Sequence, residues 1–147
     1  MRLLILIISF FNVCMCIEAQ QTINLSQLTG TTWRQVSPNC ELTPTTIIFS
    51  RTTITRIKEY STLNKKNTRT FPYYLYTSEP TSFISGNVGN KTKGSYIVKY
   101  LSNDKRFYSY KVIGLKNDTL TVYYEPDENA IGGNSKRGFN IVYKRVK

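Results

Sequence analysis

Tyrosine is the residue type with the most distinctive binding chemistry in this sequence, which contains 11 tyrosines. The apolar ring of a tyrosine can contact a ligand while its hydroxyl fixes the orientation of that ligand. We assign five of them to the inner face of predicted strands, as candidate ligand-binding residues: Tyr96, Tyr100, Tyr108, Tyr110 and Tyr124. The same pattern also arises when tyrosines fill a small core, and that alternative stays open.

Lysines alternate with these tyrosines along the chain. Lys99 and Lys111 occupy positions whose side chains point to the face opposite the tyrosines. Binding of single-stranded nucleic acid needs aromatic and basic side chains in one groove. We therefore expect no nucleic-acid partner.

The sequence contains no histidine, which excludes a Ser-His-Asp triad, a Cys-His pair and histidine-based metal sites within this chain. Carboxylate catalysis requires two acids placed across a cleft. Asp127 and Glu128 are adjacent and do not suit that geometry, whereas Glu59, Glu79 and Glu125 would converge only through folding. We expect no catalysis, no cofactor and no metal site.

The first 19 residues are typical of a secretion leader. Arg2 supplies the positive charge, residues 3–11 form a mostly apolar stretch, and Ala19 is a small residue at the expected cleavage site. The prediction is a signal peptide over residues 1–19 and one domain over residues 20–147, exported to the periplasm or secreted. An uncleaved anchor and a lipoprotein acylated at Cys16 remain as alternatives.

The formal net charge is +11, with 20 basic and 9 acidic residues. The basic residues occur singly or in pairs and form no long run, which favours a solvated cationic surface over a phosphate-tracking arm. Association with an anionic envelope surface stays open. After cleavage Cys40 would be the single cysteine, so no intramolecular disulfide is expected.

Short segments rich in β-branched and aromatic residues follow one another after residue 30, separated by turn-forming residues. The predicted strands cover residues 32–36, 45–50, 52–60, 71–77, 82–85, 95–101, 106–115, 119–125 and 138–145. Tight connections favour an all-β, up-and-down antiparallel barrel of about eight strands over a two-sheet sandwich. A short helical turn is expected at residues 24–28, before the barrel.

The segment 125–137 is longer than a hairpin between the last two strands requires. It is interpreted either as a rim over a barrel mouth or as a plain surface loop. A calcium site formed by Asp127, Glu128 and Asn129 is not favoured, because the spacing matches no calcium-binding loop.

Gly30 and Trp33 mark the start of the first barrel strand. A glycine close before a tryptophan allows a sharp turn, after which the indole can plug one end of a closed sheet. With Leu28, these residues resemble the opening signature of lipocalin-like, calycin-type barrels, and specifically of small exported proteins of Gram-negative gut-type bacteria. Further similarity lies in a late hairpin and in the closing segment: Tyr110, Ile113, Leu115, Asn117, Asp118, Leu120, Val122, Tyr143, Lys144 and Arg145.

The resemblance implies that a basic side chain near the C-terminus lies across the first-strand tryptophan. Arg145 is the first candidate and Arg137 the second. It also implies a small, partly apolar or amphipathic ligand inside the barrel. The alternative functions are a barrel-scaffold inhibitor or adaptor that binds a macromolecule through its rim loops, and a carboxylate-dependent enzyme.

Overall fold

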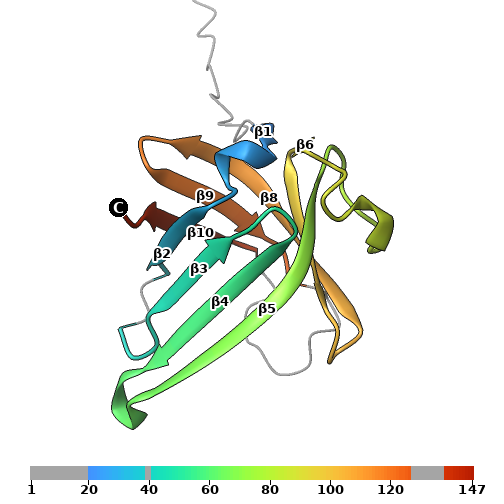
Figure 1. Ribbon diagram of the computed structural model, residues 1–147. Helices are drawn as coiled ribbons and strands as arrows, with labels where there is room; N and C mark the ends of the chain where they lie inside the picture. The colour runs from blue at the N-terminus through green and yellow to red at the C-terminus, as the bar shows by residue number, and fades with distance from the viewer. Residues whose placement is uncertain (1–19, 39–40, 127–137) are drawn as a thin grey trace, which may run out of the picture.

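Eight antiparallel strands close into a barrel in the computed structural model, which describes residues 20–38, 41–126 and 138–147 (Figure 1). The barrel strands are β2 (Thr31–Ser37), β3 (Thr45–Phe49), β4 (Thr53–Tyr60), β5 (Lys65–Tyr76), β7 (Tyr96–Leu101), β8 (Arg106–Lys116), β9 (Thr119–Tyr124) and β10 (Phe139–Arg145). The prediction of a single up-and-down barrel is confirmed.

The barrel closes because β10 pairs with both of its neighbours. Tyr143 lies opposite Gln35 of β2 on one side and opposite Leu120 of β9 on the other. From β3 to β9, each barrel strand pairs with the barrel strands before and after it in the chain, and β2 pairs with β3 and β10. Closure removes the unpaired strand edges that an open sheet of this composition would expose.

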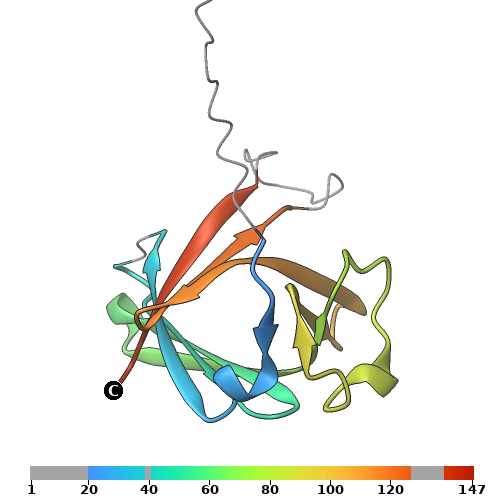
Figure 2. The same ribbon diagram turned by 90° about the horizontal axis from the view of Figure 1, so that it is seen from above.

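The N-terminal segment covers one end of the barrel, here called the closed end (Figure 2). It contains β1 (Ile23–Asn24) and the single 3₁₀ turn η1 (Leu25–Gln27), so the expected helical turn is present. β1 pairs with β6 (Lys93–Gly94) in a separate two-stranded sheet. A Cβ on Gly94 would lie 2.4 Å from backbone atoms of Tyr76, so this close approach requires glycine.

The opposite end, here called the open end, is formed by the connections on the other side of the strands. The β4–β5 connection contains the 3₁₀ turn η2 (Ser61–Leu63) and ends with Asn64 at a φ of 46°. Asparagine tolerates this left-handed conformation better than most residues. The β4–β5 hairpin extends well beyond the rest of the barrel (Figure 1).

The predicted strand at residues 82–85 is wrong. The segment between β5 and β6 includes the 3₁₀ turn η3 (Ser85–Asn87) and lies on the outside of the barrel (Figure 2). Tyr74 hydrogen-bonds to the backbone of this segment: the tyrosine hydroxyl donates to the Ser82 carbonyl and accepts from the Ile84 amide. Side-chain hydrogen bonds therefore replace a strand ladder here.

The main core fills the closed end of the barrel and continues along its inner wall. Trp33, Ile23 and Leu28 are fully buried there, together with inward residues of the strands. No helix within the described ranges is long and apolar enough to cross a membrane. The predicted leader (residues 1–19), Cys40 and most of the segment 125–137 lie outside the described residues.

Candidate ligand-binding cavity

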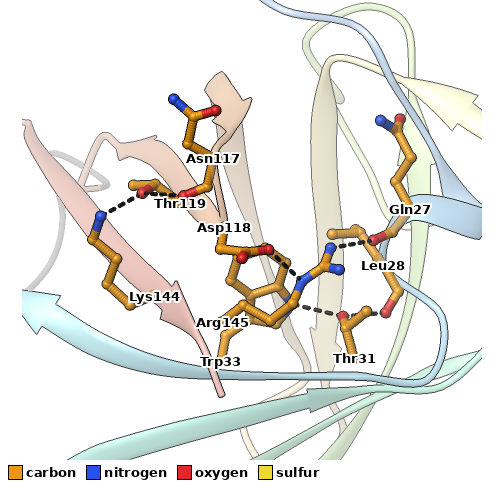
Figure 3. A network of polar contacts seen from close by, with 9 residues as sticks. All are labelled: Gln27, Leu28, Thr31, Trp33, Asn117, Asp118, Thr119, Lys144 and Arg145. Carbon is orange, nitrogen blue, oxygen red and sulfur yellow. Dashed lines mark hydrogen bonds and ion pairs between the residues drawn. The ribbon is translucent and has the colours of Figure 1, made fainter. Parts of the chain in front are cut away.

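Trp33 forms the floor of the barrel interior at the closed end. Its side chain is fully buried, and its indole N–H donates to the Thr31 hydroxyl at 2.6 Å (Figure 3). The Thr31 hydroxyl in turn donates to the Leu28 carbonyl. Gly30 makes the turn into β2 at a φ of 76°. The three residues of the opening signature therefore act together to position the indole.

Arg145 covers the outer side of this floor. Its guanidinium carbon lies 4.9 Å from the centroid of the Trp33 ring. Arg145 Nε lies 3.5 Å from a carboxylate oxygen of Asp118, and a terminal nitrogen donates to the Gln27 carbonyl (Figure 3). The position implied for Arg145 by the resemblance is observed, whereas Arg137 lies outside the described residues.

Between this floor and the open end lies a cavity of about 270 Å³, which we call the barrel cavity. Its volume is just below the range of about 300–1,000 Å³ that is typical of small-molecule pockets, which suits a small ligand. Apolar side chains from six strands form most of its wall: Ile47, Ile54, Phe71, Ile97, Val122 and Ile141. Gln35, Pro38, Thr43 and Phe139 line the part nearest the open end.

Three cationic side chains project into this largely apolar space: Arg56 and Lys58 from β4 and Lys99 from β7. The Lys99 ammonium lies 4.7 Å from the Tyr110 ring centroid and 5.3 Å from that of Phe71. The Arg56 guanidinium carbon lies 5.4 Å from the Phe71 centroid. Aromatic rings thus supply favourable contacts for these cations inside the barrel.

Burial and neighbouring charge change the ionisation of groups in the barrel cavity. Burial, together with the positive charges of Arg56 and Lys58, lowers the pKa of Lys99 to about 7. Burial raises the pKa of Tyr143 to about 12 and also raises the pKa of Tyr110. The positive charge of Arg56 opposes both tyrosine shifts, so this side chain acts across the barrel from β4 to β8 and β10.

Three of the five tyrosines proposed from the sequence lie together on the inner face. Tyr110 lines the barrel cavity. The ring of Tyr124 lies 5.4 Å from that of Tyr110 and 6.1 Å from that of Tyr108, measured between centroids. Tyr108 also contacts the Lys99 ammonium at 5.8 Å. These tyrosines form an aromatic cluster on β8 and β9.

The inward assignment of Tyr96 and Tyr100 is wrong. The inner face of β7 is formed by Ile97 and Lys99. Tyr100 stacks on Phe83 outside the barrel at a centroid distance of 4.9 Å, and Tyr96 lies across from Tyr76 and Lys111 on the outer face. The reason is that the segment with Phe83 covers this outer face, so apolar residues are buried there too.

The same reversal makes the outward assignment of Lys99 wrong. Sequence alternation correctly separated Lys99 from its tyrosine neighbours, but it assigned the two faces of β7 the wrong way round. A signal for the correct assignment was Ile97, an apolar residue on the same face as Lys99. Arg56 and Lys58 were not identified from the sequence, where β4 shows no clear alternation.

The described residues contain no group of three or more potential metal-ligating side chains. No protein-family model matches the chain, and no curated protein or solved structure matches it. Inference about function therefore depends on the geometry of the barrel cavity.

Proposed function

We propose that this chain is an exported, lipocalin-like binding protein that holds a small, partly apolar ligand in the barrel cavity, without catalysis. The observation that supports this most directly is the cavity of about 270 Å³, lined by apolar residues from six strands. Its floor is closed by Trp33, so the ligand would enter from the open end.

The lipocalin-like assignment is part of the same proposal. It is supported by the closed eight-stranded topology and by the contact of Arg145 with Trp33 beneath the barrel interior. The proposed export from a Gram-negative bacterium is supported by the leader-like sequence of residues 1–19.

A neutral fluorescent probe, N-phenylnaphthylamine, tests the proposed ligand site. Wild-type protein should enhance its fluorescence in a saturable titration. Ile141→Phe adds bulk inside the barrel cavity and should weaken binding at least tenfold. Val142→Phe, one position along β10 on the outer face, is the matched control and should bind as wild type does.

Two results would count against this function. One is the absence of saturable uptake of any apolar probe by folded wild-type protein. The other is equal loss of binding in both variants, since that would place the probe outside the barrel cavity. Circular dichroism on each variant verifies that the comparison is made between folded proteins.

A second candidate function is the binding of a macromolecule through the rim of the open end. Leu42 and Leu63 are 68% and 64% exposed, and the Ser61 amide bonds to the Leu42 carbonyl, which brings the two connections together. Exposed leucines beside the basic β4–β5 hairpin are compatible with an adaptor or inhibitor surface. Loss of partner capture by Leu42→Ser with Leu63→Ser, at unchanged probe uptake, would favour this alternative.

A further inference from the structure

The barrel cavity has an unbalanced charge. Arg56, Lys58 and Lys99 line it, and no carboxylate is found among the described residues of its wall. The carboxylates in described ion pairs lie elsewhere: Glu59 pairs with Lys66 on the β4–β5 hairpin, and Asp118 pairs with Arg145 at the closed end. Cations withdrawn from water without a counter-ion destabilise a folded protein.

Arg56 carries a buried hydrogen-bond donor that faces this excess of positive charge without a partner of its own among the described residues. Its Nε atom is buried and has no hydrogen-bond partner in the part of the chain that the structure describes. An arginine normally uses its planar N–H groups for paired bonds to carboxylate or phosphate oxygens. The guanidinium instead contacts the Phe71 ring, which leaves its donor available to a group within the cavity.

Lys99 adds a second cation to the same region. Its ammonium lies over the rings of Phe71, Tyr108 and Tyr110. The titratable and charged groups around it are Arg56 and Lys58 on β4, Tyr73 on β5, Tyr108 and Tyr110 on β8, Tyr124 on β9 and Tyr143 on β10. At neutral pH these groups provide positive charge and hydroxyl donors but no negative charge.

We infer that the ligand of the barrel cavity is an amphiphilic organic anion, whose acidic group is held by Arg56 and Lys99 and whose apolar body packs on the inner wall. This inference rests on the proposed function and specifies the chemical class of its ligand. The acidic group would satisfy the Arg56 Nε donor and neutralise the cations. Ile47, Val122 and Ile141 would contact the apolar body.

The ionisation of Lys99 adds a pH dependence to this site. Since its pKa is near 7, a bound carboxylate stabilises the protonated amine and binding is coupled to proton uptake. Affinity for the anion should therefore fall as the pH rises from 6.5 to 9, although the carboxylate itself remains ionised throughout. A neutral ligand should show a much smaller change.

Decanoate and decanol form a matched pair for the test, because they share an alkyl chain and differ in charge. Isothermal titration calorimetry at pH 6.5 should show decanoate binding at least tenfold more tightly than decanol. At pH 9 the difference should be smaller. Titrations in two buffers of different ionisation enthalpy should reveal proton uptake with decanoate near pH 7.5 and none with decanol.

Substitutions test which residues bind the acidic group of decanoate. Arg56→Met and Lys99→Met should each weaken decanoate binding at least tenfold while leaving decanol binding nearly unchanged. Lys99→Met should also abolish the proton uptake. Lys111→Met removes a lysine from the outer face of β8 and should leave every value as in wild type.

The possible outcomes separate the two proposals. Equal or tighter binding of decanol in wild type would overturn the anion inference and leave the proposed function standing, and this comparison needs no variant. Unchanged decanoate binding in both methionine variants would also overturn it. Failure of the folded protein to bind either compound would reject the proposed function together with the inference.

Discussion

The guanidinium carbon of Arg145 lies 4.9 Å from the ring centroid of Trp33, and the two residues lie opposite each other in the antiparallel pairing of β10 with β2. The last strand thereby covers Trp33, which lies near the start of the first barrel strand. Asp118 and the Gln27 carbonyl hold the guanidinium in place, so the contact connects η1 and β10 with the β8–β9 turn. We expect this arrangement to stabilise the closed end.

Trp33→Ala should be among the most destabilising single substitutions, lowering the free energy of unfolding by about 3–5 kcal/mol because it removes a fully buried indole. Arg145→Met should cost about 1 kcal/mol, the scale of a cation–π contact with partly exposed polar partners. Lys144→Met is the control for Arg145, because the Lys144 side chain is exposed and donates only to the Thr119 hydroxyl among the described residues. Denaturant unfolding measures all three.

Emission from Trp33 gives an independent measurement, since it is the only tryptophan in the sequence. Native protein should emit at a short wavelength typical of a buried indole, and unfolding should shift the emission to longer wavelength. Native emission like that of free tryptophan in water would contradict the assigned position of the indole.

Stability of the ligand-free protein should increase with pH between about 7 and 9 because of Lys99. The pKa of Lys99 is about 7 in the folded protein and 10.5 in the unfolded chain, so over this range the unfolded chain binds more protons. The free energy of unfolding should rise by roughly 2 kcal/mol between pH 6.5 and 9, and below pH 6.5 this contribution should be constant.

Lys99→Met should remove most of that rise, whereas Lys111→Met should retain it. Denaturant titrations across the pH range, without ligand, provide the measurement. The same slope in wild type and Lys99→Met would show that Lys99 keeps an ordinary pKa. The stability argument for an uncompensated cation in the barrel cavity would then fail.

Tyr110 and Tyr100 provide a comparison between inner and outer faces. Tyr110→Leu should weaken the binding of an apolar probe by about 1–2 kcal/mol, through loss of a hydroxyl contact and some packing. Tyr100→Leu should leave probe affinity unchanged, because its ring packs on Phe83 outside the barrel, and should instead loosen the segment between β5 and β6. Probe titration measures the first effect and hydrogen exchange of that segment the second.

Export remains a prediction from sequence. Mass spectrometry of natively produced protein should find an N-terminus at or within a few residues of Gln20. A lipid adduct at Cys16 would instead make the protein membrane-anchored.

Local sequence patterns were sufficient to predict the barrel and the tryptophan that plugs its closed end. Alternation of short strands and tight turns predicted the up-and-down topology, and Gly30 with Trp33 predicted the closed end, because turn chemistry and side-chain period are local properties. Alternation also correctly assigned Tyr108, Tyr110 and Tyr124 to the inner face, because the opposite faces of β8 and β9 are less apolar.

The face of β7 that lies inside the barrel depends on contacts with segments distant in the sequence. Alternation separates the two faces of a strand but does not show which face is inside. Assigning the more apolar face to the inside is wrong when a distant segment buries the outer face. Phe83 does so here by packing on Tyr100 and Tyr74, so apolar residues mark the outside of β7 and a lysine marks the inside. The cation cluster of Arg56 and Lys99 likewise exists only because barrel closure brings β4 and β7 around one apolar space.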